Sequence, residues 1–106
     1  MQKNFRQVEF DKFPTTWAAG IEGMTLEGEV IQMKTAQVDG EERPLAIVCD
    51  DEGKQWTLWM NGVLQGKFRA GNVKPGDYIR VTYLGKKPSP VSRYLFNDFN
   101  LEVAEV

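Results

Sequence analysis

The side chains in this sequence whose types and spacing indicate a chemistry are aromatic and basic residues on predicted strands. In residues 54–60, apolar and more polar side chains alternate, as they do in a strand that is buried on one face. Trp59 belongs to the more polar set, and an outward indole ring can stack on a nucleic-acid base for about 1 to 3 kcal/mol. The predicted outer face of this strand carries Gln55, Thr57 and Trp59, and the predicted core face carries Trp56, Leu58 and Met60.

A second group of aromatic and basic residues lies in the C-terminal half. Residues 78–84 and 94–103 alternate in the same way, and residues 85–90 between them contain two lysines and two prolines, which predicts a basic loop. Aromatic rings beside cations suit a flexible strand with unstacked bases and charged phosphates. For each aromatic residue taken alone, the alternative is a role in the core or in covering the N-terminal segment. The interpretation as a nucleic-acid-binding surface therefore rests on the aromatic and basic residues together. The candidate binding residues of this group are Arg80, Lys86, Lys87, Arg93, Tyr94 and Phe96.

The side chains that most enzymes use are missing or unsuitably placed. The chain has no histidine, its single Cys49 lies in an apolar run typical of a buried position, and no serine has a candidate base. The acidic run 50–52 is typical of a solvated hairpin turn rather than of a divalent-cation site. Gly85 and Lys86 lack the spacing of a phosphate-binding loop. We therefore expect a protein that is not an enzyme and that uses no metal and no cofactor.

Length and composition predict a single domain. At 106 residues and 42% hydrophobic content, the chain can bury one core. We assign residues 1–24 to an N-terminal arm that packs on the domain, and residues 25–106 to the domain itself. Phe13 and Trp17 of the arm are interpreted as covering the core, with exposed binding aromatics as the alternative. No apolar run suits a transmembrane helix or a signal peptide, so we expect a cytoplasmic protein without membrane partners.

Charge is distributed unevenly along the chain. The net charge of −2 counts against a general electrostatic binder of nucleic acids, because Lys and Arg contacts to phosphates dominate that affinity. The acids cluster in residues 22–29, 39–42 and 50–52, whereas many of the cations lie between Lys67 and Arg93. The second half is locally basic and remains compatible with a nucleic-acid partner.

Turn signals divide the first half of the domain into three strands. The first covers residues 25–35, and Gly28 is expected to mark a bulge or a sharp bend in it. The Asp39-Gly40 pair predicts a hairpin turn within the polar segment 37–44, followed by a strand at residues 45–49. The stretch 54–60 then forms the third strand of a meander.

A short helix and two strands follow. Asn61 is expected to cap the helix, Leu64 and Phe68 share its buried face, and Gly71 ends it. Residues 75–77 supply a turn before the fourth strand. The predicted core-facing residues are Ile79, Val81 and Tyr83 in the fourth strand, and Leu95, Asn97, Phe99, Leu101 and Val103 in the fifth.

This order of elements predicts an all-β fold with one short helix. Three strands, a helix and two strands match the five-stranded Greek-key barrel of the OB-fold, with the helix between strands three and four. Its ligand face is built on strands two and three and on the loops that join strands one to two and four to five. An open α+β sheet is the main alternative.

Four stretches of this chain also resemble a known family. They are LEGEV at residues 26–30, QWTLW at 55–59, GDYIRVTYLGKK at 76–87 and YLFNDFNLEV at 94–103. Over roughly residues 24–104 the pattern resembles the phage-type OB-fold single-stranded DNA-binding proteins. The resemblance implies sequence-tolerant binding of single-stranded DNA in replication, recombination or repair, with self-association as a homo-oligomer. The sequence does not separate DNA from RNA as the partner.

A protein of a different class remains as the alternative. The net negative charge and the acids of residues 39–42, in the loop where a DNA binder ordinarily has cations, favour a protein-interaction or structural module without nucleic-acid binding.

Overall fold

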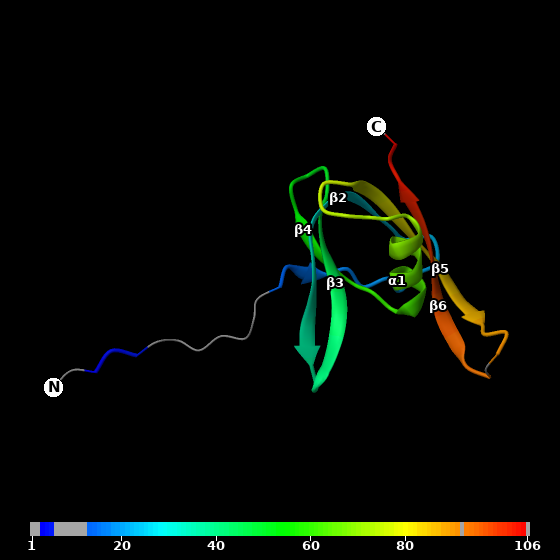
Figure 1. Ribbon diagram of the computed structural model, residues 1–106, viewed down its shortest axis with the longest axis horizontal. Coiled ribbons are helices and arrows are strands. Elements are labelled where there is room, and N and C mark those ends of the chain that lie inside the picture. The colour runs from blue at the N-terminus through cyan, green and yellow to red at the C-terminus, as the bar shows by residue number, and fades with distance from the viewer. Residues whose placement is uncertain (1–2, 6–12, 92, 106) are drawn as a thin grey trace.

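The computed structural model describes residues 3–5, 13–91 and 93–105, and it shows a curled, open β-sheet with one short helix (Figure 1). The all-β class and the predicted order of three strands, a helix and two strands are confirmed, with one short strand added before them. The elements are β1 (Thr15–Thr16), β2 (Thr25–Val38), β3 (Glu41–Cys49), β4 (Gln55–Trp59), α1 (Gly62–Ala70), β5 (Tyr78–Pro88) and β6 (Leu95–Val103).

Strand β2 belongs to both halves of the sheet. Its first part pairs with β5, and its part from Glu29 onward pairs with β3. Gly28 lies at this changeover, where the Cβ of any other residue would overlap the backbone carbonyl of Cys49. We predicted a bulge or a sharp bend at Gly28, and the register shift with β3 lies two residues further on, between Val30 and Gln32. Gly28 is therefore required because the backbone of Cys49 approaches it closely. The register shift of β2 falls at the residues that follow.

The sheet has the order β1-β4-β3-β2-β5-β6, and its two edges do not meet in the described part of the chain. Strand β1 adds in parallel to the edge of β4 that would have to pair with β6 in a closed barrel. On β6, the carbonyls of Asn97 and Phe99 accept hydrogen bonds from the side chains of Asn61 and Lys67. Trp17 packs against the core, with its ring centroid 6.3 Å from that of Phe99. An open six-stranded sheet thus stands where we expected a closed five-stranded barrel.

The core lies inside the curl of the sheet, and α1 covers it. Leu64 and Phe68 of the helix are buried there, and Asn61 caps the helix by accepting a hydrogen bond of 3.0 Å from the backbone N–H of Leu64. The helix ends at Ala70 with Gly71 as its cap. These predictions are confirmed, as is the burial of Ile79, Val81, Tyr83 and Phe99 on the core face of β5 and β6.

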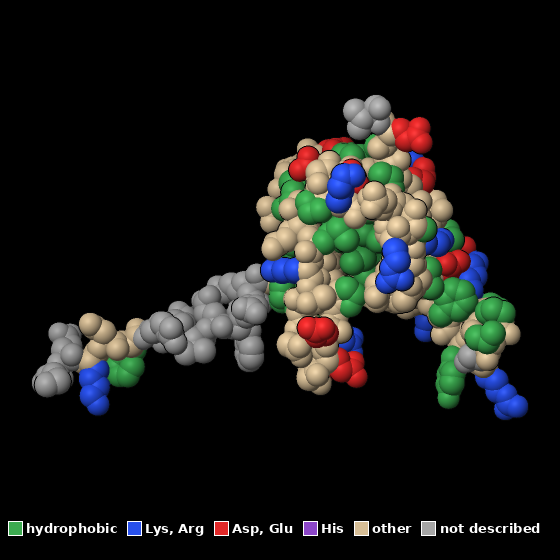
Figure 2. Space-filling model, in the orientation of Figure 1, with side chains coloured by type: hydrophobic (Ala, Val, Ile, Leu, Met, Phe, Trp, Pro, Cys, Tyr) green, Lys and Arg blue, Asp and Glu red, His purple; other side chains and the backbone are tan. Residues whose placement is uncertain are grey.

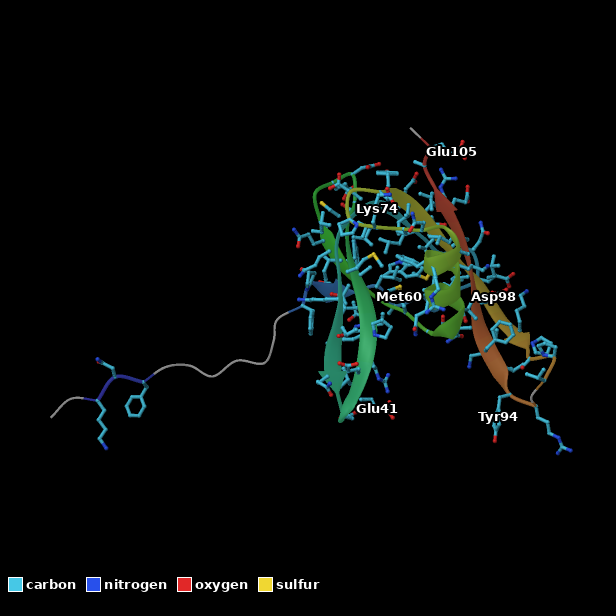
Figure 3. All side chains as sticks on the ribbon, viewed as in Figure 1. Glu41, Met60, Lys74, Tyr94, Asp98 and Glu105 are labelled. Carbon is cyan, nitrogen blue, oxygen red and sulfur yellow. The ribbon has the colours of Figure 1, made fainter. Side chains whose placement is uncertain are left out.

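Two hairpins extend beyond the core on the same side of the molecule (Figures 1 and 3). Strands β2 and β3 run up to the predicted Asp39-Gly40 turn, where φ values of 51° and 81° match a type I′ turn. Strand β5 continues past Gly85, where the register with β6 shifts, to Pro88. Most of the predicted turn segment 37–44 and part of the predicted loop 85–90 are therefore strand. We call residues 35–44 the β2–β3 prong and residues 86–96 the β5–β6 prong.

Candidate nucleic-acid interface

Strand β4 presents its two faces as the alternation predicted. Leu58 is buried in the core, and Trp56 and Met60 are half-buried against it. Gln55, Thr57 and Trp59 point to the other face, which we call the outer face, but their environments differ. Gln55 is exposed and Trp59 is half-buried, whereas Thr57 is fully buried and its Oγ1 donates a hydrogen bond of 2.6 Å to the carbonyl of Pro14. The exposure that we expected for Thr57 is not found, because the N-terminal arm covers it.

The arm gives the outer face a buried layer of its own. Leu45 and Ile47 of β3 lie beside Trp59 and Thr57 in the sheet and are buried, although they belong to the outer face and not to the main core. The backbone N–H of Trp17 continues the β1 ladder with a bond of 2.9 Å to the carbonyl of Thr57. Residues 13–17 are therefore held at the edge of the outer face by backbone and side-chain hydrogen bonds together.

The same arm holds the indole ring of Trp59. The rings of Phe13 and Trp59 meet edge to face, with centroids 5.7 Å apart and an interplanar angle of 74°. The indole N–H donates a hydrogen bond of 3.3 Å to the Oγ1 of Thr16 in β1. Trp59 thus stays partly accessible while two residues of the arm restrict its rotation.

Two cations that sequence reasoning missed lie next to this aromatic pair. The Nζ of Lys34 in β2 is 4.7 Å from the centroid of the Phe13 ring. Arg43 of β3 lines a hollow of about 200 Å³ together with Val38 and Trp59. The sequence carried a signal for both cations, because alternation counted back from the Asp39-Gly40 turn puts Lys34 and Arg43 on the face of Trp59. We missed Arg43 because the second strand was predicted to begin at residue 45, whereas Lys34 lay within the predicted strand 25–35 and its face was left unassigned.

The β5–β6 prong collects most of the other predicted binding residues. Tyr94 is 81% exposed, Phe96 is half-buried, and Lys86, Lys87 and Arg93 lie on the same hairpin. Lys86 pairs with Asn97 and Lys87 with Phe96, so the two lysines point to opposite faces. From residue 78 to residue 97 the sequence contains no Asp or Glu. Figure 2 shows apolar and basic side chains together on this prong.

Part of the predicted face assignment for β6 fails at this prong. Leu95, which we expected to face the core, is 62% exposed, and Val91 at the tip is 93% exposed. The alternation is correct for Phe99, Leu101 and Val103, which lie over the core. From Phe99 back toward Leu95, the hairpin extends past the core. The more apolar face of β6 therefore has no core residues to pack against in this part.

Arg80 is separated from the other candidates by its ion pairs. Its guanidinium lies 3.2 Å from a carboxylate oxygen of Glu27 and 3.3 Å from one of Glu102. The hydrogen bond to Glu27 and the charges of both acids raise the pKa of Arg80. Two carboxylates already neutralise this side chain, so it offers less positive potential to a phosphate than an unpaired arginine would.

An acidic hollow of about 550 Å³ lies at a different place, beside the turn after β3. Asp50 accepts a hydrogen bond of 2.9 Å from the indole N–H of Trp56, which lowers the pKa of Asp50. Asp51 accepts one of 2.8 Å from the hydroxyl of Tyr78, which raises the pKa of Tyr78 to about 12. Among residues 3–5, 13–91 and 93–105, no group of acidic, cysteine or histidine side chains is arranged to hold a metal ion.

The structure thus places the predicted binding residues other than Arg80 in two groups. One lies on the outer face at β4, and the other lies on the β5–β6 prong, with β3 and β2 between them in the sheet. No protein-family model, curated protein or solved structure matches the chain. The helix that the described residues contain is too short and too polar to cross a membrane.

Proposed function

We propose that this chain binds single-stranded DNA without sequence preference and without catalysing a reaction. The observation that carries the proposal is Trp59, a partly accessible indole ring on the outer face of β4 with Lys34 and Arg43 close by. Stacking on an aromatic ring tolerates any sequence because every base has a π-face, and the cations supply phosphate contacts. Strands β2 to β6, with α1 between β4 and β5, have the order of the five OB-fold strands, here as an opened barrel.

The β5–β6 prong supports the same proposal. It combines the exposed ring of Tyr94 with three cations and no acid, which is the composition of a surface that contacts phosphates and unstacked bases. In the OB-fold the corresponding loop flanks the ligand face. We propose that Lys86, Lys87, Arg93, Tyr94 and Phe96 form a second contact for the same strand. Of the remaining candidates, Gln55 is an exposed polar contact, whereas Thr57 acts by holding the arm and Arg80 by pairing with acids.

The biological setting is taken from the family resemblance. We propose a role in phage-type replication, recombination or repair in the cytoplasm, with self-association of the chain and without a cofactor. RNA remains a second ligand of the same chemistry, because stacking and phosphate contacts do not depend on the 2′-hydroxyl.

A titration of a fluorescent oligo-dT at low salt tests the proposal. With about four phosphate contacts, we expect the logarithm of the binding constant to fall with the logarithm of salt concentration with a slope of about −3. An oligo-U of the same length tests RNA in parallel. Absence of binding at high micromolar protein would rule out nucleic-acid binding as the main function.

The acidic hollow favours one other candidate function, a protein-interaction module. Its walls combine the apolar Trp17 and Leu26 with Glu27, Asp51 and Glu52, which would suit a basic partner segment. This alternative predicts no oligonucleotide binding beyond a weak, salt-sensitive background that is unchanged in Trp59→Ala. The same titration therefore separates the two candidates.

A further inference from the structure

The hollow beside Trp59 has the components of a site for one nucleotide. Its walls are the indole ring of Trp59, the aliphatic side chain of Val38 and the guanidinium-bearing side chain of Arg43. All three belong to the outer face. Trp59 pairs with Leu45, and Arg43 lies two residues before Leu45 on the same face of β3. Arg43 pairs with Ala36, and Val38 lies two residues after Ala36 on the same face of β2. An aromatic surface, an apolar wall and a planar cation match a base together with its phosphate.

Within the described part of the chain, the ion pair of Arg43 is a weak one. Its described ion-pair partner is Glu41, with 3.6 Å between guanidinium nitrogen and carboxylate oxygen. The Arg43 and Glu41 side chains are 54% and 73% exposed, so water screens the attraction between them. A phosphate oxygen can take the place of this carboxylate without leaving a buried charge behind.

We propose that this hollow binds one nucleotide unit of the strand, with the base against Trp59 and the phosphate on Arg43, and that Glu41 competes with the phosphate for Arg43. The proposal rests on the proposed function and adds to it a defined site and a built-in competitor. It explains why an acid on the outer face beside the site is compatible with binding: the acid lowers the affinity without closing the site.

The two adjacent acids of the β2–β3 prong provide a matched pair of variants. Glu41 shares the outer face with Arg43, whereas Glu42 pairs with Gln37 and points to the opposite face. Glu41→Gln and Glu42→Gln change the net charge equally and lie next to each other in the chain. Any difference between them therefore reports on the face and not on the overall charge.

Oligo-dT titrations of the full chain should show tighter binding for Glu41→Gln than for Glu42→Gln. Since an exposed ion pair is weak, we expect a difference of about 1.5- to 5-fold. In the background of Arg43→Gln the difference should vanish, and Arg43→Gln alone should reduce the salt slope by about one. Equal effects of the two glutamine variants, or a difference that persists without Arg43, would overturn the proposal.

Failure of this proposal is distinguishable from failure of the proposed function. If the wild-type chain binds no oligonucleotide, both are wrong. If the wild type binds and Trp59→Ala weakens binding while Arg43→Gln binds as the wild type does, the nucleotide site is wrong and the proposed function stands. Circular dichroism melts accompany each titration. Glu41, Glu42 and Arg43 are exposed, so the fold tolerates their substitution, and Trp59→Ala is titrated at a temperature where its melt shows it to be fully folded.

Discussion

Replacing Trp59 by alanine tests two properties of one side chain, because the indole ring is both a candidate stacking surface and a contact of the N-terminal arm. The substitution removes the edge-to-face contact with Phe13 and the hydrogen bond to Thr16. An aromatic pair contributes about 0.5 to 1.5 kcal/mol, and a hydrogen bond contributes a similar net amount. We therefore expect the free energy of unfolding to fall by about 1 to 3 kcal/mol.

Binding should fall by more than this loss of stability can explain. Loss of one stacked base weakens binding by about 1 to 3 kcal/mol, which corresponds to about 5- to 150-fold in the dissociation constant. The assay is fluorescence anisotropy of labelled oligo-dT at a temperature where melts show both proteins to be fully folded. Trp59→Phe retains an aromatic ring but not the N–H that reaches Thr16, so it should retain most of the binding.

Trp56→Ala is the matched control on the same strand. Trp56 packs against the core, and its indole N–H donates a hydrogen bond to Asp50. Trp56→Ala should therefore lower the free energy of unfolding by about 3 to 5 kcal/mol. The reasoning is refuted if Trp59→Ala binds oligo-dT as tightly as the wild type. It is refuted equally if Trp59→Ala destabilises the chain more than Trp56→Ala does, because the outer face would then be the principal core.

Three further predictions concern the framework that holds this site. Thr57→Val leaves the carbonyl of Pro14 without its donor and should lower the free energy of unfolding by about 1 to 3 kcal/mol in urea titrations. Gly28→Ala should prevent or severely weaken folding, because its Cβ would overlap neighbouring backbone; a cooperative melt near that of the wild type would contradict this. The hydrogen bond from Trp56 lowers the pKa of Asp50 below its ordinary value of 3.8, so this carboxylate stabilises the fold above that pH and stops doing so as pH falls through the lowered value. Asp50→Asn should accordingly show a smaller drop in urea midpoint between neutral pH and pH below 3.8.

Local patterns in the sequence predicted the features that depend on a single element. The alternation in β4 and β5 assigned their faces, and the cap at Asn61 with Leu64 and Phe68 predicted α1, because burial follows directly from the period of a strand or helix. The Asp39-Gly40 turn was also predicted from local sequence, because a type I′ turn needs positive φ at both central residues and therefore favours Asp and Gly there.

Features that depend on contacts between distant segments could not be predicted in this way. Nothing in the sequence around Thr57 indicates that Pro14, 43 residues away, covers it. The open sheet could not be predicted either. Strand β1 occupies the edge of β4 that would pair with β6 in a closed barrel, and local patterns do not indicate where β1 pairs. The pattern at Leu95 was misleading for a related reason: alternation gives the face of a strand but not how far the core extends beneath it.

The separation of charge between the two prongs shows why the net charge is a poor guide to the partner of this chain. The tip of the β2–β3 prong carries three acids, and the β5–β6 prong carries three cations without an acid (Figure 2). A phosphate chain is repelled at the first tip and attracted at the second, so it should first meet the β5–β6 prong. Removing cations from the β5–β6 prong should therefore act mainly by lowering the association rate, whereas removing Trp59 should act mainly by raising the dissociation rate. Stopped-flow mixing of oligo-dT with Lys87→Gln and with Trp59→Ala distinguishes the two effects, and equal changes in both rates for both variants would show that the prong and the outer face act as one surface.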